Sequence, residues 1–521
     1  MGVTAAYELA AAQLDPPFGL ASVLSASCRP RILRKLNCRN PRVCGRRLDG
    51  LASVWVRVWE ETALTDSFDV VVVGARCAGS PLAALLARQG VKVALVERAT
   101  FPRDTLSTHI FEADALAFLD RLGLTERLRA TGAPFISRID TRAGDFRWSI
   151  EVPPRAGDVG GFTSIRRFVL DPILAHAAEE SGAQVRMATA VTGLVQDGGR
   201  VNGVRIRTNG SDGELRARLV VGADGRNSTV ANLIGARKYN LVPHQRFAYW
   251  AFFEGADMRP EPTLVFHRWA ERFVIASPCD DGLYQVIVIP EMGELARFRA
   301  DLESSFMEYA RSCEPVANAL AGAHRVGKFF GVLRWVGFFR EPCGPGWVLV
   351  GDAGHFKDPS PGRGIGDAFC QVDALAPAII AGLDGSGGGL DARMVRWGRW
   401  RDREFADYYW FANDLGKAGG PPVVLPQILR DLHAKGQIGR FHELFSHRAK
   451  PSRVLNPARL VGSAGRLLRD HGGRRAVLTE VRTLVTQNVH RQLLNHRRAY
   501  AAPSETTQSA GHTEVEDSAL T

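Results

Sequence analysis

The sequence predicts an α/β fold: a parallel-sheet domain that is interrupted by an antiparallel sheet and followed by a helical region. Three observations support this prediction. An apolar run at 68–75 is followed by a glycine turn, a helical stretch and a second apolar run. Two later apolar runs, at 217–225 and 346–354, each lead into a loop with Asp and Gly. Between them, residues 245–290 form short segments rich in aromatic residues, which is typical of antiparallel strands.

Length and charge set the first limits on function. The chain has 521 residues, 45% of them hydrophobic, so more than one domain with a sizeable core is expected. The net charge is +11, and residues 447–500 carry twelve Lys or Arg against two Asp or Glu. Such a flank can bind nucleic acid or anionic lipid. We prefer a solvated, arginine-rich helical face, because no nucleic-acid motif accompanies the charge, and we predict no nucleic-acid partner.

The cysteines indicate neither a metal centre nor a disulfide framework. The eight cysteines form no Cys-x-x-Cys pair and no His cluster has metal-ligand spacing, so we expect no metal, free thiols and a cytoplasmic location. No apolar run approaches the roughly 20 residues that span a bilayer, so we expect no membrane span. The first 64 residues lack a basic start and a clear periodicity, which favours a poorly ordered extension.

The first glycine turn, GARCAG, has the context of a Rossmann-like dinucleotide-binding loop. It follows a buried strand and precedes a helix that ends near Gly90 and a second strand at 91–97. Gly74 permits the tight turn and Gly79 permits close packing of the helix, whose N-terminus can bind a pyrophosphate. Glu97 ends the second strand, where a carboxylate either accepts hydrogen bonds from a ribose or is simply solvated.

Two further loops follow strands in the same way. Asp224 and Gly225 follow the run at 217–225, and Asp352 follows the run at 346–354 and precedes a predicted helix at 366–383. Each loop alone could be an ordinary turn, because Asp and Gly are common turn residues. Three such loops that converge on one ligand are more informative than any single one.

The remaining pattern fills in the elements. We predict a helix at 170–182, strands at 183–208 with a turn at the Asp-Gly-Gly sequence, and one helix over 293–313. After the glycine-rich stretch at 384–389 the chain is predicted to be mainly helical, and its last twenty or so residues to be disordered.

The three loops, in this order and spacing, resemble the FAD-dependent aromatic hydroxylases of the p-hydroxybenzoate hydroxylase type. The wider set includes geranylgeranyl reductases and flavin-dependent halogenases, and the resemblance covers roughly residues 68–385. The sequence RRFVLD matches the family's Arg-x-x-Leu-Asp helix start, with Arg167 as its arginine. The resemblance implies a Rossmann-like FAD-binding domain of the glutathione reductase type, with an inserted antiparallel β-sheet substrate domain and a helical C-terminal region.

The resemblance also implies a set of site residues. Those expected to bind FAD are Gly74, Arg76, Ala78, Gly79, Glu97, Arg98, Arg167, Val191, Asp224, Gly225, Asp352, Pro359, Gly362, Gly364 and Ile365. The segment Ser107–His109 is expected near the flavin ring. His109 would bind substrate or donate a proton, or serve only as a structural hydrogen-bonding residue.

Three positions depart from the family pattern. Arg76 replaces the middle glycine, Ala231 replaces an arginine of the second motif, and Gly366 replaces an asparagine of the third. We expect the Arg76 side chain to fold over the phosphates or toward Glu97.

These observations predict a division of the chain. The expected parts are an N-terminal extension at 1–64, an FAD-binding domain at 65–240 and 341–385, a β-sheet substrate or lid domain at 241–340, a helical region at 386–500 and a disordered tail at 501–521.

The expected function is an NAD(P)H-dependent flavoprotein monooxygenase that hydroxylates or epoxidises a small apolar or aromatic substrate through a flavin hydroperoxide. FAD, NADH or NADPH, molecular oxygen and the substrate are the expected partners. A geranylgeranyl reductase-like double-bond reductase and a non-catalytic flavin- or partner-binding protein are the alternatives. A halogenase is disfavoured, because its Trp-x-Trp-x-Ile-Pro segment is missing.

Overall fold

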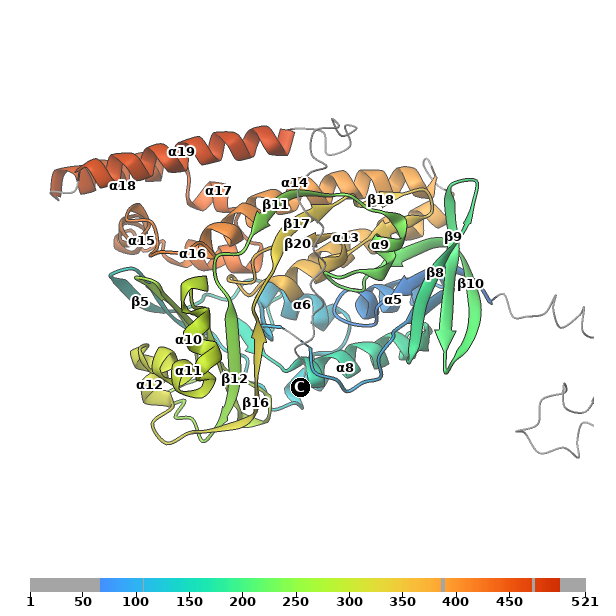
Figure 1. Ribbon diagram of the computed structural model, residues 1–521, viewed down its shortest axis with the longest axis horizontal. Coiled ribbons are helices and arrows are strands. Elements are labelled where there is room, and N and C mark those ends of the chain that lie inside the picture. Colours follow the sequence, from blue (N-terminus) through green and yellow to red (C-terminus); the bar gives the residue numbers. More distant parts are fainter. Residues whose placement is uncertain (1–65, 106, 386–388, 471–473, 497–521) are drawn as a thin grey trace, which may run out of the picture. The chain divides into compact units, whose positions relative to one another are not determined.

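The computed structural model describes residues 66–105, 107–385, 389–470 and 474–496 (Figure 1). The predicted N-terminal extension and C-terminal tail lie outside these residues.

A mainly parallel sheet forms the centre of the cofactor half, as predicted. Its strands run in the order β18 (Cys343–Gly344), β19 (Trp347–Leu349), β10 (Ser211–Gly222), β1 (Asp66–Val73), β2 (Val93–Val96) and β7 (Gln184–Arg186). The pairs β19–β10, β10–β1, β1–β2 and β2–β7 are all parallel. Alternate valines of β1 enter two different cores, Val70 and Val72 on one face and Val71 and Val73 on the other, which explains the continuous apolar run.

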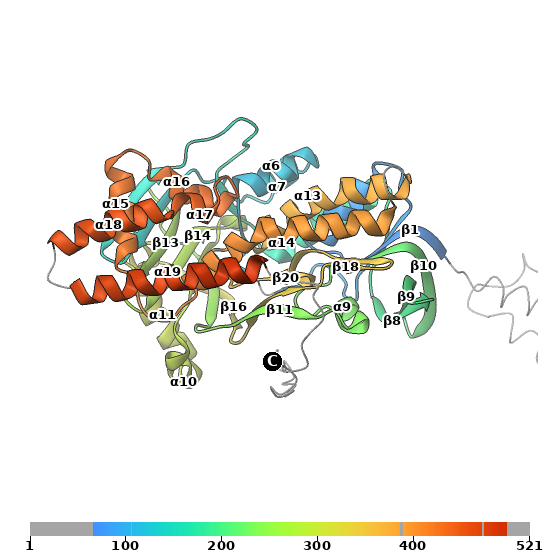
Figure 2. The same ribbon diagram turned by 90° about the horizontal axis from the view of Figure 1, so that it is seen from above.

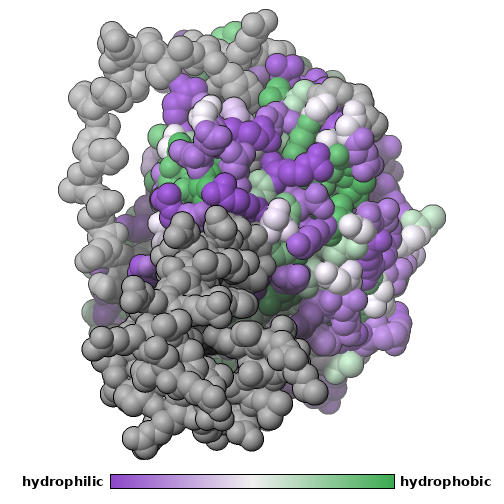
Figure 3. All heavy atoms as spheres, turned by 90° about the vertical axis from the view of Figure 1, so that its right-hand side faces the viewer, coloured by the Kyte–Doolittle hydropathy of each residue, from purple (hydrophilic) through white to green (hydrophobic). Residues whose placement is uncertain are grey.

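Helices cover one face of this sheet and a β-meander covers the other. The helices α5 (Gly79–Ala87), α8 (Arg167–Glu180) and α13 (Gly364–Leu383) contribute to the first core. The strands β8 (Thr189–Asp197) and β9 (Arg200–Thr208) turn at Gly198–Gly199, both with positive φ, which confirms the predicted hairpin. The part of the surface that is coloured in Figure 3 carries mainly hydrophilic side chains, with hydrophobic ones between them.

The helix α13 is long and apolar enough to cross a membrane, which the sequence prediction missed. More than half of the most apolar 18-residue stretch of this helix is buried inside the protein. Phe369, Val372, Leu375 and Ile379 lie in the core beside α5, so the apolar composition is accounted for by packing.

The second sheet has seven strands and is mostly antiparallel, as predicted for residues 245–290. Its order is β16 (His324–Val332), β12 (Ala248–Glu254), β15 (Tyr284–Val288), β14 (Arg272–Pro278), β13 (Thr263–Trp269), β4 (Arg138–Ala143) and β5 (Phe146–Glu151). The last two strands come from residues that the predicted division assigned to the FAD-binding domain, and β4 pairs with β13 in parallel. The boundaries 65–240 and 241–340 therefore do not match the sheet; the wider division stays a prediction.

The single helix predicted at 293–313 is wrong. The chain forms α10 (Leu295–Ala300) and α11 (Leu302–Arg311), separated by Asp301 in an extended conformation. The Asp301 carboxylate accepts a hydrogen bond from the Ser304 N–H at 3.0 Å and so caps the second helix. Together with α12 (Glu314–Ala319) these helices cover one face of the seven-stranded sheet, where Phe298 and Phe306 are fully buried.

The C-terminal region is helical, as predicted (Figure 2). Its elements are α14 (Leu390–Leu415), α15 (Val424–Ala434), α16 (Gly439–His442), η4 (Glu443–Ser446), α17 (Pro451–Val454), α18 (Pro457–Asp470) and α19 (Arg474–His496). Residues of α15, α16 and η4 share an apolar core with β4, β13 and β14. This region therefore covers the second face of the seven-stranded sheet.

Candidate cofactor and substrate site

The three predicted loops meet at one edge of the parallel sheet. The register pairs Val73 with Gly222, and Gly222 with Leu349, so the carboxyl ends of the three strands are level. Gly74 has φ +102°, and a Cβ there would lie 2.6 Å from the Ala223 carbonyl oxygen. A Cβ at Gly351 would lie 3.0 Å from the Cβ of Ala78. The first loop thus contacts both of the others, so the three loops meet at one place as predicted; that they bind one ligand stays a prediction.

The N-terminus of α5 is available to an anion. No side chain caps it, and its N-cap residue, Ala78, is buried. A Cβ at Gly79 would lie 1.8 Å from the Gly74 carbonyl oxygen, so only glycine allows the helix to start here. The first N–H groups of a helix lack partners within the helix and carry partial positive charge, which suits a pyrophosphate.

Glu97 is buried at the end of β2, so the solvated alternative for this residue is wrong. Its carboxylate oxygens accept hydrogen bonds from the N–H groups of Ala75 and Ala99, both at 3.0 Å. A carboxylate has about four acceptor sites, so lone pairs remain for ribose hydroxyls. The neighbouring Arg98 is exposed.

The two loop aspartates differ. The Asp224 carboxylate accepts hydrogen bonds from the Ser228 hydroxyl at 2.5 Å and the Val230 N–H at 3.2 Å, and so fixes the start of α9 (Thr229–Ile234) beside Gly225. Asp352 makes no hydrogen bond with a described residue. Burial raises the pKa of Asp352, against the nearby Lys357 and two arginines. Asp352 is therefore the acceptor that is available to a polyol chain.

The Arg76 side chain does not fold toward Glu97, which is one of its two expected positions; the other, over the phosphates, stays a prediction. Its guanidinium contacts the Asp171 carboxylate at 2.8 Å and lies 5.3 Å from the centre of the Phe101 ring. The same carboxylate, fully buried, accepts a hydrogen bond from Arg167 at 2.6 Å. One buried acid thus orients both predicted arginines, and charge pairing compensates its desolvation.

The third loop leads into α13. Gly362 has φ +72°, and its N–H donates to the Pro359 carbonyl oxygen at 2.8 Å, so this N–H already has a partner within the loop. Gly364 is exposed at the start of α13, and Ile365 is buried in the core. Val191, on β8, is partly buried against the core on the other face of the sheet.

His109 has the geometry of a structural residue. Its Nδ1 accepts a hydrogen bond from the Arg167 N–H at 3.0 Å, and its ring lies against Trp250 and Phe252. Burial, together with Arg167 and Arg166, lowers the pKa of His109 to about 3. The ring is therefore neutral, so it cannot act as a cationic acid at neutral pH; a catalytic role stays a prediction.

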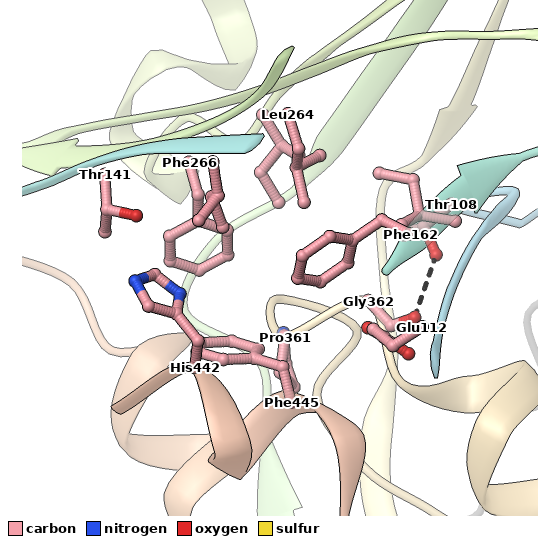
Figure 4. Close-up of a pocket in the computed structure, with 13 residues that line it drawn as sticks. Thr108, Glu112, Thr141, Phe162, Leu264, Phe266, Pro361, Gly362, His442 and Phe445 are labelled. Atoms are coloured by element: carbon pink, nitrogen blue, oxygen red, sulfur yellow. Dashed lines mark hydrogen bonds between the residues drawn. The ribbon is translucent and has the colours of Figure 1, made fainter. Parts of the chain in front are cut away.

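A narrow pocket lies between the antiparallel sheet, the third loop and the C-terminal helices (Figure 4). Its cavity volume is about 20 Å³. Its lining is mostly apolar and consists of Thr108, Ile110, Glu112, Ile139, Thr141, Phe162, Leu264, Phe266, Ile275, Pro361, Gly362, His442 and Phe445. The Thr108 hydroxyl donates to the Gly362 carbonyl oxygen at 3.5 Å, which links the pocket to the predicted flavin loop.

A buried charge cluster adjoins this pocket. Arg363 contacts Glu112 at 2.7 Å and Asp114 at 2.8 Å, and Lys357 pairs with Asp367. Burial raises the pKa of Glu112 to about 8 despite Arg363, and burial lowers the pKa of Lys357 to about 7. Glu112 is the acidic side chain that faces the pocket, so it is the candidate for proton transfer.

Sequence reasoning missed Glu112, Thr141, His442 and Phe445. They come from three separate segments with no shared motif, so only the fold brings them together. Among the described residues, no group of three or more His, Cys, Asp or Glu could hold a metal.

Comparisons with known proteins agree with this geometry. A family model described as an FAD binding domain matches residues 67–253. A menaquinone reductase of Mycolicibacterium smegmatis is 30% identical over 339 residues, which cover 62% of this chain and 78% of the relative. The 6-methylpretetramide 4-monooxygenase of Streptomyces rimosus is 28% identical, over 60% of this chain and 76% of the relative.

Solved structures share the fold. A flavin-dependent brominase superposes with a TM-score of 0.62 at 18% identity and covers 82% of this chain and 100% of its own. The myxobacterial chondrochloren halogenase gives 0.61 at 22% identity, with 77% and 97% covered.

This chain belongs to the superfamily of FAD-dependent monooxygenases, reductases and halogenases that resemble p-hydroxybenzoate hydroxylase. It is an FAD-dependent oxidoreductase, so the alternative of a non-catalytic protein is not retained. The residues fit the cofactor: an uncapped helix N-terminus, the buried Glu97 carboxylate with acceptor sites left over, and Asp352, whose carboxylate has no hydrogen bond with a described residue, lie on one sheet edge.

Gly74→Val should abolish FAD binding, because the added side chain would collide with the second loop at Ala223. Arg76→Gly should retain FAD, since Arg167 still pairs with Asp171. The flavin absorbance of the purified variants measures both. Gly90→Val is the matched control: Gly90 also has positive φ, but nothing lies within 4 Å of its added Cβ. A yellow Gly74→Val protein, or a folded but colourless Arg76→Gly protein, would contradict this account.

Stability should fall as the pH falls below about 6.5. Burial lowers the pKa of His109 and His442 to about 3, and that of His355 and His447 well below the ordinary value. Protons therefore bind the unfolded chain first. Each histidine should cost about 1.4 kcal/mol of unfolding free energy per pH unit between pH 6.5 and its folded pKa.

Urea unfolding at several pH values measures this slope. His355→Phe, which suits the aromatic surroundings of that ring, should reduce the slope by about the contribution of one histidine. The change to Phe at the exposed His176 should leave the slope unchanged. A slope that His355→Phe leaves unchanged would show that burial does not hold this ring neutral.

Proposed function

We propose that this protein is an NAD(P)H-dependent flavoprotein monooxygenase that hydroxylates or epoxidises a small apolar or aromatic substrate. The observation that carries the proposal is the enclosed, mostly apolar pocket against the third loop at Pro361–Gly362. A site of this kind excludes water from a reactive oxidant and so limits its unproductive loss.

When bound, FAD would supply electron transfer from NAD(P)H and the activation of molecular oxygen. The residues of this chain would hold the FAD and enclose its reactive ring. The α5 N-terminus, Glu97 and Asp352 would bind its pyrophosphate, ribose and polyol groups. The antiparallel sheet and η4 close the pocket, and Glu112, protonated at neutral pH by virtue of its raised pKa, can give a proton to a substrate oxygen.

The relatives support this class of reaction. Besides the 6-methylpretetramide 4-monooxygenase, they include a rifampicin monooxygenase from Streptomyces venezuelae, 29% identical over 61% of this chain. A double-bond reductase is the second candidate. The menaquinone reductase favours it, and a neutral Glu112 could serve equally as its proton donor.

The deciding experiment follows NAD(P)H oxidation by the holoenzyme with and without aromatic and polyketide-like compounds, while oxygen and hydrogen peroxide are recorded. We expect a substrate to accelerate NAD(P)H oxidation and to consume one oxygen molecule per product, with little peroxide. Glu112→Gln should lower kcat at least tenfold and leave FAD bound, because it removes the proton but keeps the shape. Product formation at the same rate without oxygen would establish the reductase instead.

A further inference from the structure

Two buried polar atoms in the pocket have no hydrogen-bond partner among the residues that the structure describes. They are the Thr141 hydroxyl, on β4, and the His442 Nδ1, on α16; the two side chains are 1% and 2% exposed. Figure 4 shows them side by side at one end of the pocket, with Glu112, Thr108 and Gly362 at the other end. Buried polar groups are nearly always satisfied, so a shared orphan pair indicates a missing partner.

The hydrogen bonds fix what His442 offers. The Trp148 indole N–H, which can only donate, donates to His442 Nε2 at 3.1 Å. Nε2 therefore has no proton. Burial lowers the pKa of His442 to about 3, so the ring is neutral and its single proton is on Nδ1. The atom without a partner is thus a hydrogen-bond donor.

The surroundings restrict what can bind there. Between the two polar ends the walls are Phe162, Phe266 and Leu264, and Phe445 closes the side (Figure 4). The arginine and lysine beside the pocket belong to the opposite end, where Asp114 pairs with Arg363 and Asp367 pairs with Lys357. A neutral oxygen on a flat apolar ring satisfies this arrangement, whereas an anion would lack a cation at the orphan pair.

We propose that Thr141 and His442 form an oxygen-binding subsite that takes a hydroxyl or carbonyl oxygen of an aromatic or quinoid ring. The proposal rests on the proposed function only in treating this pocket as the substrate site. The His442 N–H donates to either kind of oxygen. The Thr141 hydroxyl donates to a carbonyl or accepts from a hydroxyl. The oxygen would anchor one end of the ring and direct the other end toward Glu112 and the third loop.

The closed pocket sets a condition for entry. About 20 Å³ accommodates roughly one water molecule, so an oxygen fits the orphan pair but a ring requires the walls to part. Phe445 lies on the 3-10 helix that directly follows the short helix of His442, so both side chains come from one segment of the C-terminal region. Substrate selection therefore depends on a region outside residues 67–253, the part matched by the FAD-binding model.

The test measures ring binding to the oxidised holoenzyme without NAD(P)H, by perturbation of the flavin absorbance. Naphthol and naphthoquinone should each bind at least tenfold more tightly than naphthalene, since one or two hydrogen bonds to otherwise unpaired atoms are worth at least about tenfold. His442→Phe and Thr141→Val should each remove about tenfold of this preference, measured as the ratio of the affinity for naphthol or naphthoquinone to the affinity for naphthalene. Thr141→Ser should restore it.

Controls separate recognition from structure. His433→Phe, an exposed histidine of α15, should leave the preference intact. Trp148→Phe should weaken the preference less than His442→Phe does. It removes the hydrogen bond that holds the imidazole proton on Nδ1 but leaves the imidazole ring in place. If His442→Phe lacks FAD or does not fold, the Thr141→Val variant and the affinities of the wild-type protein for the three compounds still test the subsite. Equal affinity for the three compounds, binding of none, or variants with an unchanged preference would overturn the subsite.

Failure of the two proposals is distinguishable. The binding preference without oxygen-dependent turnover would reject the monooxygenase and retain the subsite. Oxygen-dependent turnover with no preference for oxygen-bearing rings would reject the subsite and retain the monooxygenase.

Discussion

The level register of three parallel strands is the constraint on which this structure depends. β1, β10 and β19 come from distant parts of the chain, yet their carboxyl ends align, so the three loops that follow them meet at one edge. The contact of Gly74 with Ala223 allows no side chain at that point. Because the backbone makes these contacts, the site tolerates an arginine at position 76 but needs glycine at positions 74 and 79.

Buried charge pairs connect this edge to the pocket. Asp171 orients Arg76 and Arg167 at the first loop, and Arg363 of the third loop pairs with Asp114 and donates a hydrogen bond to Glu112 in the pocket wall. Breaking such a pair leaves an uncompensated charge, which is strongly destabilising. The cofactor loops and the substrate pocket are therefore parts of one network, and a change at Arg363 should affect both.

The sequence was sufficient for the parts that local chemistry determines. Apolar runs, glycine turns and strand-end acids predicted the parallel sheet and the three loops, because each signal lies within about ten residues. It was insufficient where distant contacts decide. The strands β4 and β5 carry several charged residues and were not recognised, and Asp301 breaks a continuous helical pattern by capping its second half. His442 and Thr141 carry no motif, and only the docking of α16 beside β4 makes them neighbours.

We propose that this chain directs molecular oxygen to a ring held in the pocket between the antiparallel sheet and the C-terminal helices. Turnover under isotopically labelled dioxygen, with mass spectrometry of the product, tests it most directly. We expect one labelled oxygen atom in each product molecule when FAD is bound and NAD(P)H is supplied. A product without the label, formed at the same rate under nitrogen, would contradict it.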